Sequence, residues 1–382
     1  MSEGDAARVV AIGAAMLLLV AGPAQAQSSP VQWSGHYKNL LIRSDTWTGE
    51  PFTLDVNRLR IELKGSIAPA LRFDLQYDNE LLLGSYLRTA QFAQQKDVPP
   101  PQYWRADANT FETSRLYGTH RLYRATLAIS AGDTDLRFGR QRVAWGTGRF
   151  WSPLDVLNPV SAIALERDER LGVDALLVEH RFGPLTRLAA VAAPSRSSGR
   201  STAALQWHDN LRGLDYSLIG GRMLGRRMWG FDLAGQMGQA GIRSEVTRER
   251  PAGGSAYTRV LIGADYAFSN TLAITTELFF NGAGARDPAG YDFRALMSAA
   301  VPALGRRYAG VHASYEITPL LKWDGDVVTN LADRSRYLSL GLTYSLQTNL
   351  DLRLGVQRFS GTAGTEYSRP PDALYAQVQA FF

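Results

Sequence analysis

Charged and apolar residues alternate one by one along most of this chain, and that alternation limits its choice of fold. Leu59, Ile61 and Leu63 stand between arginine, glutamate and lysine residues, and residues 71–78 repeat the arrangement. Because successive side chains of a β-strand point to opposite faces, each segment predicts a strand with one apolar and one charged face. About 18 segments of roughly ten residues show this pattern, which is typical of transmembrane strands. They lie near residues 34–44, 53–66, 70–82, 118–130, 133–143, 170–181, 184–193, 201–209, 213–223, 227–236, 239–248, 256–268, 271–281, 305–317, 320–330, 334–346, 349–360 and 373–382.

The links between these segments alternate in length. Every second link is a turn of two or three residues, as at 68–69, 132–133 and 348–349. The other links contain all the long excursions, at about 83–117, 144–169, 194–200, 249–255, 282–304 and 361–372. A bacterial barrel has short turns on its periplasmic rim and long loops outside, whereas a soluble β-protein has no reason for this order. We therefore predict an all-β fold, a closed antiparallel up-and-down transmembrane β-barrel of about 18 strands, with 16 as the alternative count.

The N-terminus predicts export. Arg8 precedes an apolar run from Val9 to Val20, and the small-residue pattern Ala24-Gln25-Ala26 follows. This order is typical of a secretory signal peptide, and the run is too short for a membrane-spanning helix. We expect residues 1–26 to be a signal peptide and residues 27–382 to form the barrel.

The C-terminus indicates how the barrel is delivered and closed. The last segment ends on Phe382 and shares one face among Leu374, Ala376, Val378 and Ala380. A terminal aromatic residue of this kind resembles the signal read by the barrel-assembly machinery, which we expect as a partner through Phe382. We expect this apolar edge to pair with the first strand, since an open edge would aggregate. The bacterial outer membrane follows as the location, with lipid and lipopolysaccharide around the barrel.

Composition excludes several classes of function. The chain has no cysteine, which removes disulfides, thiolate metal sites and cysteine nucleophiles. The net charge of +5 comes without any block of Lys or Arg, so we expect no nucleic-acid partner. The five histidines show no metal-ligand spacing, and we expect no cofactor and no enzymatic activity. His312 and Ser314, two residues apart on one strand, leave an outer-membrane enzyme as a remote alternative.

The third external link, residues 139–170, predicts a constriction. Its aromatic residues Trp145, Phe150 and Trp151 suit a loop that folds into the barrel and packs on the inner wall better than one in plain solvent. Charges at such a narrowing give a wide barrel its selectivity. The alternative is a solvated outer loop with incidental charges. The predicted constriction residues are Arg149, Asp155, Glu166, Arg167, Asp168 and Arg170.

Charged residues within the strands are expected to line the pore. A cationic side chain facing lipid near the bilayer midplane would cost about 2–4 kcal/mol, so the lumen is the favourable location. The alternative is that some are paired across strands as structural networks. A bulge near Gly139 would decide whether Arg140 and Arg142 point inward. The predicted pore-wall residues are Arg58, Arg60, Glu62, Arg72, Asp74, Arg124, Arg137, Glu277, Asp324 and Arg353.

The strand count, the terminal Phe382, the alternating links and the block 136–160 together resemble the large porin-like barrels that include phosphate-selective porins and alginate-export-type channels. The resemblance implies a narrowed barrel of 16 or 18 strands that passes small polar or charged solutes by diffusion. A dedicated export conduit for polysaccharide or lipid is the alternative function. The lysine ladder of phosphate-selective members is absent from the sequence, which leaves the solute open, and the choice between a homotrimer and a monomer is open too.

Overall fold

The computed structural model describes residues 31–98, 100, 102–159, 161–167, 169–197, 199–297 and 301–382. The predicted signal peptide, residues 1–26, lies outside the described residues, and so does the predicted constriction residue Asp168. Among the described residues, no helix has the length and apolarity needed to span a membrane.

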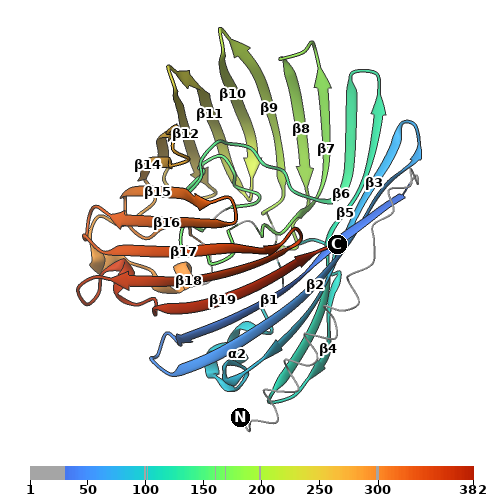
Figure 1. Cartoon of the computed structure of the whole chain (residues 1–382). Helices are drawn as coiled ribbons and strands as arrows, with labels where there is room; N and C mark the ends of the chain where they lie inside the picture. The colour runs from blue at the N-terminus through green and yellow to red at the C-terminus, as the bar shows by residue number, and fades with distance from the viewer. Residues whose placement is uncertain are drawn as a thin grey trace.

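The described residues form a single antiparallel sheet of 19 strands, and 18 of these close into a barrel (Figure 1). The strands are β1 (Val31–Asp45), β2 (Pro51–Ala68), β3 (Leu71–Leu83), β4 (Asp107–Glu112), β5 (Leu116–Ala131), β6 (Thr134–Gln141), β7 (Val173–Arg181), β8 (Arg187–Ala193), β9 (Thr202–Leu211), β10 (Leu214–Met223), β11 (Arg226–Met237), β12 (Ala240–Pro251), β13 (Tyr257–Ala267), β14 (Ala273–Asn281), β15 (Arg307–Thr318), β16 (Leu321–Asn330), β17 (Arg336–Gln347), β18 (Leu350–Ser360) and β19 (Ala373–Phe381). The predicted all-β closed barrel of 18 strands is confirmed.

The barrel closes where β19 pairs with β1. The register runs from His36 opposite Phe381 to Ser44 opposite Ala373. The amide of Gly35 also donates to the carbonyl of Phe382 at 2.9 Å, and the amide of Phe382 donates back at 3.1 Å. Closure gives the backbone groups of both terminal strands a partner, which hydrocarbon could not supply.

The two faces of the wall differ as the alternation predicts. Outward-facing Ile262, Leu278 and Trp229 are 59%, 58% and 58% exposed, as suits an apolar band in contact with lipid. Inward-facing positions instead contain buried charges, among them Arg60 and Glu277. The outer surface of the wall is therefore apolar, and its inner surface is polar.

Short helices lie in three of the long links. The link between β3 and β5, residues 84–115, is called the second loop here and contains η1 (Ser85–Arg88) and α2 (Ala90–Gln95). The link between β14 and β15 contains η2 (Pro288–Gly290) and α3 (Phe293–Met297), and the link between β18 and β19 contains η3 (Glu366–Ser368). Tyr86, Leu87 and Phe92 pack with Tyr117 of β5 in a small apolar cluster. The second loop is thereby held against the inner side of the outer rim.

Strand β4 was not predicted, and the course of β6 explains it. β6 leaves the wall at Gln141, so it pairs with β5 only over Ala125–Ala131. β4 pairs with the upper part of β5 instead, from Asp107 opposite Arg121 to Glu112 opposite Tyr117. The short strand β4 therefore gives hydrogen-bond partners to the backbone of β5 where β6 no longer pairs with it.

The register near Gly139, which the sequence left open, is continuous. The β6 ladders are regular, and Arg140 sits on the outward face, where its guanidinium is 2.9 Å from Asp174. The register shift is in β5, where Gln76 pairs with Arg124 and Tyr77 with Leu122. The extra residue, Tyr123, turns into the barrel, as bulges commonly redirect a side chain.

The closing register can be tested because the chain has no cysteine of its own. Asn39 lies opposite Val378, so the double variant Asn39→Cys with Val378→Cys should form a disulfide between β1 and β19. Oxidised and reduced samples are compared by gel mobility. The control pairs Arg43→Cys with Val378→Cys; Arg43 lies opposite Leu374, four positions along the ladder, so this pair should not cross-link. A cross-link in the control alone would contradict the register.

Candidate functional site: a loop inside the barrel

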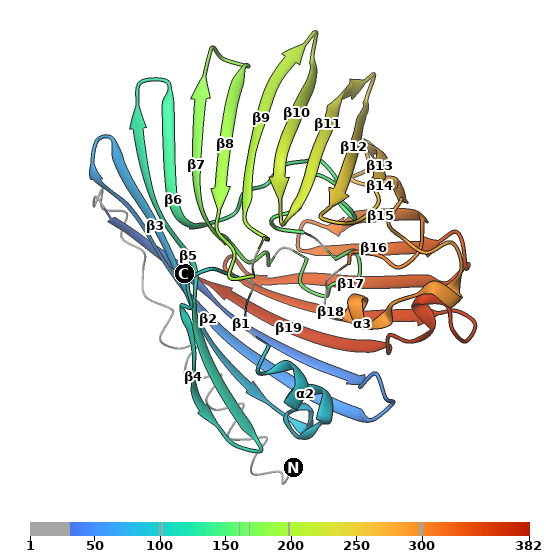
Figure 2. The same ribbon diagram turned by 180° about the vertical axis from the view of Figure 1, so that it is seen from behind.

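The link between β6 and β7, residues 142–172, runs through the interior of the barrel (Figures 1 and 2). One side of this internal loop is apolar and packs on the inner wall of β7 to β11. The buried cluster formed there comprises Val143, Trp145, Leu154, Leu157, Ala175, Leu177, Ala189, Val191, Ala193, Ala204, Ile219, Met223 and Met228. An inner wall of alanine, valine and methionine would otherwise face water, so covering it favours the inward position of the loop.

Aromatic packing holds the next part of the loop against β13 to β17. Phe150 and Trp151 are 1% and 2% exposed, and Trp151 stacks on Phe279 of β14 with ring centroids 5.3 Å apart. Phe150 lies over Gly310 of β15, where an added Cβ would meet its ring at 2.7 Å. The wall is therefore shaped to receive these rings.

Two buried glutamates of the wall bind the backbone of the loop. Glu277 of β14 accepts hydrogen bonds from the amides of Arg149 at 2.7 Å and Phe150 at 2.9 Å. Glu245 of β12 accepts from the amides of Gly148 at 2.7 Å and Leu154 at 3.0 Å, and from Thr147. Hydrogen bonds to a charged acceptor are stronger than neutral ones and fix direction. The loop from 147 to 154 is thus fastened at several amides.

Beyond its middle, the loop reaches the opposite wall through acidic side chains. Glu166 accepts from Lys38 of β1 at 2.9 Å and from Arg58 of β2 at 3.1 Å. Glu169 accepts from Arg60 of β2 at 2.8 Å and from Lys38 at 3.3 Å. The loop is therefore tied to β1 and β2 as well as to β7–β15, and it crosses the lumen.

The cations of β1 and β2 keep these loop carboxylates ionised. Burial alone would raise the pKa of Glu169, but Arg60, Lys38 and Arg58 outweigh it and lower the pKa to about 2. Burial also acts to raise the pKa of Glu166, but Arg58 and Lys38 outweigh it, and the pKa is lowered. Since both pKa values are depressed, these ion pairs stabilise the docked loop above about pH 4.5 and are lost as the pH falls toward 2.

Arg167 and His312 meet at a third part of the barrel wall, beside Asp326 of β16. The guanidinium of Arg167 pairs with Asp326 of β16, and His312 Nδ1 lies 2.9 Å from the same carboxylate. Nearby, Arg353 of β18 makes a bidentate pair with Asp324 at 2.7 and 2.6 Å. Charge of both signs therefore lines the space between the loop and β15–β18.

Asp155 belongs to the loop but is buried and does not line this space. It is 4% exposed and accepts from Arg170 at 2.9 Å. Burial raises the pKa of Asp155 to about 7, although Arg170 opposes the shift. Its charge therefore changes near neutral pH, directly behind an arginine of the cavity wall.

The space left between the loop and the wall is a polar cavity of about 700 Å³. Arg149 is its most exposed cation, with a side chain that is 66% exposed and 3.6 Å from Asp265. The charged residues that line the cavity are Lys38, Arg149, Glu166, Arg167, Glu169, Arg170, Arg243, Asp324, Asp326, Asp351 and Arg353. The cavity thus offers charges of both signs to a small solute.

The predicted constriction residues mostly meet here. Arg149, Glu166, Arg167 and Arg170 line the cavity, Asp155 does not, and Asp168 lies outside the described residues. Of the predicted pore-wall residues, Asp324 and Arg353 line the same cavity, and Arg58 and Arg60 hold the loop. Glu277 is covered by the loop rather than open to the pore.

The remaining pore-wall residues lie away from the cavity. Glu62 pairs with Lys64 at 2.8 Å, and Arg72 donates to Ser130, both toward the rim of short turns. Arg124 donates to the carbonyl of Arg170 at 3.2 Å. Asp74 accepts from Gln76 at 3.2 Å, and Arg137 is exposed on β6.

Sequence analysis missed Lys38, Glu169 and Glu245. Lys38 and Glu245 lie in predicted strands, and Glu169 lies in the charged run 166–170, from which the other four residues were selected, so the signal was present. What was absent from the sequence is the path of the loop, which alone brings residues 166–169 to β1 and residues 147–154 to β12.

Two histidines lie near a serine and a carboxylate, the residue types of a nucleophile and its base. His312 pairs with Asp326 rather than with Ser314. Ser217 lies 3.2 Å from His208 Nδ1, but its residue is only 3% exposed, and Asp215 is 4.0 Å from the other ring nitrogen. The hydroxyl of Ser217 is therefore enclosed by the protein in this structure.

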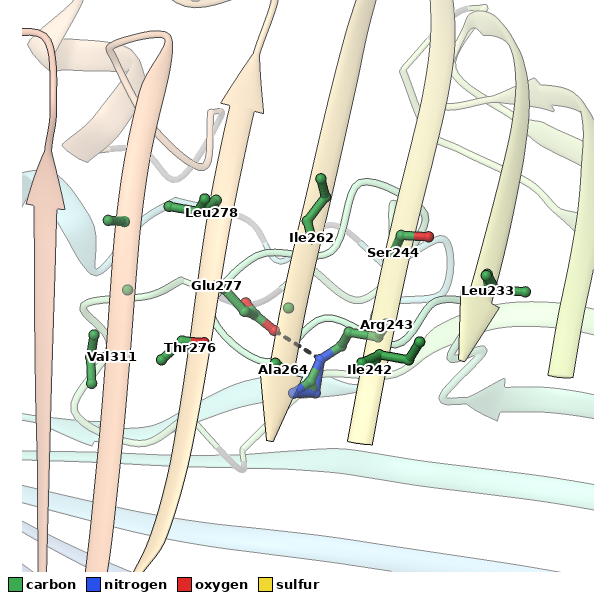
Figure 3. Close-up of a pocket in the computed structure, with 13 residues that line it drawn as sticks. Leu233, Ile242, Arg243, Ser244, Ile262, Ala264, Thr276, Glu277, Leu278 and Val311 are labelled. Atoms are coloured by element: carbon green, nitrogen blue, oxygen red, sulfur yellow. Dashed lines mark ion pairs between the residues drawn. The ribbon is translucent and has the colours of Figure 1, made fainter. Parts of the chain in front are cut away.

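The wall has a hollow near Glu277, one of the residues that fasten the loop (Figure 3). A hollow of about 470 Å³ lies over β11 to β15, lined on its outer side by apolar residues such as Ile262 and Leu278. The ion pair between Arg243 and Glu277, 3.3 Å, lies behind it. At Gly263 an added Cβ would meet both of these side chains at 3.0 Å. Glycine at this position leaves room for the buried ion pair.

Together these features define an outer-membrane β-barrel whose lumen is crossed by a fastened internal loop. No protein-family model and no curated protein matches the chain. Solved structures share the fold. The chain is similar to OpdK of Pseudomonas aeruginosa with vanillate, at 12% identity over 92% of this chain and 98% of that one, with a TM-score of 0.58.

Two further solved structures resemble the chain. OccAB4 of Acinetobacter baumannii has 10% identity over 93% of this chain and 99% of its own, with a TM-score of 0.61. OccK2 (OpdF) of Pseudomonas aeruginosa, in complex with glucuronate, has 10% identity over 92% and 96%, with a TM-score of 0.60. The fold is therefore that of an 18-stranded outer-membrane barrel resembling the Occ proteins.

The two wall glutamates can be tested as fasteners of the loop. In the double variant Glu245→Ala with Glu277→Ala, the amides of residues 147–154 lose their acceptors, and each hydrogen bond to a charged group contributes about 1.5–3 kcal/mol. Hydrogen exchange at these amides should therefore accelerate by at least about tenfold. The control is Glu316→Ala, which removes an exposed carboxylate paired with Lys322. Unchanged protection in the double variant would show that apolar packing alone holds the loop.

Proposed function

We propose that this protein is a passive outer-membrane channel for small polar or charged solutes, narrowed by the internal loop. The observation that carries the proposal is the cavity of about 700 Å³ between that loop and the wall, lined by cations and carboxylates. Charged groups at a narrowing favour solutes by charge and size, and a loop tied to several walls keeps the opening constant.

The solved structures support the solute class. Two proteins of similar fold were solved with vanillate and with glucuronate, which are small organic anions. Arg149, the most exposed cation of the cavity, suits such a solute. The resemblance to phosphate-selective porins and alginate-export-type channels stays a prediction of the sequence.

The remaining expectations belong to the same proposal. Cleavage after Ala26 would leave residues 27–382 as the mature barrel, delivered to the assembly machinery by its terminal Phe382. We propose that the channel has no enzymatic activity. Its oligomeric state, homotrimer or monomer, is to be measured on the purified protein.

The internal loop is tested by shortening it. Replacing residues 147–165 with a short glycine-serine linker removes the aromatic anchors and the segment fastened by Glu245 and Glu277. Single-channel conductance in a planar bilayer should rise several-fold, because the cavity would widen. Heat-dependent gel mobility serves as the folding control. A folded variant with unchanged conductance would mean that the loop does not limit the pore.

Asp155 predicts a pH response. Its pKa of about 7 means that it loses its charge between pH 8 and pH 6, so Arg170, which lies between Asp155 and the cavity, loses a counter-charge. Ion selectivity should therefore shift toward anions over this range, measured by reversal potential in a salt gradient. The raised pKa also makes the docked loop more stable as the pH falls, so the shift does not reflect release of the loop.

The matched variant for this response is Asp155→Asn, which should lack that component of the pH dependence. Any response left in the variant belongs to other groups of the cavity, such as His312. Identical pH profiles in the two proteins would rule out Asp155 as the titrating group.

A further inference from the structure

Three arginines, Arg222, Arg227 and Arg250, lie side by side on the outward faces of β10, β11 and β12. The register places Arg222 opposite Arg227, and Arg227 opposite Arg250. All three are exposed, while the next residues along their strands, Met223 and Met228, are buried inside. They lie at the ends of the strands next to the long loops, which is the outer rim of the barrel.

This arginine triad has no counter-charge of its own. Among the described residues, the side chains of Arg227 and Arg250 have no hydrogen bond or ion pair, and the side chain of Arg222 donates only to the carbonyl of Gly199 at 3.2 Å. The one nearby carboxylate, Glu249, points to the inner face and is bound there by Arg226 and Arg259.

The adjoining loops add to the positive charge. Residues 194–201 and 252–256 contain Arg196 and Arg200 but no Asp or Glu. Like charges directly opposite one another on neighbouring strands are destabilising. Three such arginines in a row therefore suit a ligand that brings negative charge.

The position of the triad indicates the kind of anion. Directly below it, on the same face, lie Leu218 and Trp229, which are 53% and 58% exposed. Apolar and aromatic residues there contact acyl chains and the membrane interface. An anion bound by the triad thus sits at the level of the headgroups, with hydrocarbon beneath it.

We propose that Arg222, Arg227 and Arg250 bind the phosphate groups of lipopolysaccharide in the outer leaflet. Guanidinium groups fit phosphate with paired hydrogen bonds, and each is more weakly hydrated than an ammonium group. The acyl chains of the same lipid pack against Trp229 and Leu218. The site lies on the outside of the wall and is independent of the solute pathway.

The test compares the folded, detergent-solubilised protein with the triple variant R222S/R227S/R250S. Both are titrated with bisphosphorylated lipid A and with lipid A from which the phosphates were removed. Wild type should prefer the phosphorylated form, and the triple variant should bind it about 100-fold more weakly, as expected for three cations at an anionic surface. Both proteins should bind the dephosphorylated form equally.

A second triple variant, R307S/R336S/R358S, provides the matched control. It removes the same charge from outward-facing positions of β15, β17 and β18, where Arg358 is already 4.0 Å from Asp372. It should retain nearly wild-type affinity. Equal losses in the two triple variants would overturn the site in favour of diffuse attraction, and so would unchanged affinity in R222S/R227S/R250S.

Inorganic phosphate distinguishes a lipid from a free anion. It should compete with lipid A only weakly, because it lacks acyl chains. Competition at equal concentration would overturn the lipid as the ligand. Conductance and heat-dependent gel mobility of R222S/R227S/R250S should match wild type, so a failure of this site and a failure of the channel proposal can be told apart.

Discussion

The whole structure depends on one constraint, which is that backbone amides in contact with hydrocarbon must find partners within the protein. The ladder between β1 and β19 meets it by closing the sheet. Once the sheet is closed, its alternating faces acquire fixed environments: lipid outside and water inside. Wall charges such as Arg60 and Asp324 then have only the interior in which to be solvated or paired.

A barrel of 18 strands is too wide for its inward side chains to fill, and in this protein the internal loop occupies part of the lumen. Its apolar side covers an apolar sector of the inner wall between β7 and β11. Its polar backbone is received by Glu245 and Glu277, and its acidic end by Lys38, Arg58 and Arg60. The loop is therefore fixed to the wall, and the cavity between them is lined by charged residues of the loop and of the strands.

The departure of β6 from the sheet has consequences at the outer rim. Strands β6, β7 and β8 have 8, 9 and 7 residues, whereas β2 and β5 have 18 and 16. The wall is therefore uneven in height. The second loop compensates by supplying β4 and by packing α2 beside Tyr117. Because β6 ends early and its loop enters the lumen, the upper edge of β5 is left open, and β4 of the second loop pairs with it.

Sequence alone determined the class of fold, because a two-residue period and the alternating lengths of the links are local properties of a strand and its turns. It also placed the aromatic residues of the loop correctly on the inner wall, since Phe150 and Trp151 are hard to accommodate in water. It did not distinguish Asp155, which is buried, from Arg149, which is exposed, because both lie in an irregular segment without periodicity.

Tertiary structure decided everything that depends on which distant segments meet. The partners of Glu166 and Glu169 are more than 100 residues away along the chain, and the acceptors of the loop amides about 90 to 130 residues away. The unpaired arginines of β10 to β12 became a cluster only through cross-strand register. A strand pattern fixes the face on which a side chain lies, but only the closed and registered sheet, with its loop in place, fixes what that side chain touches.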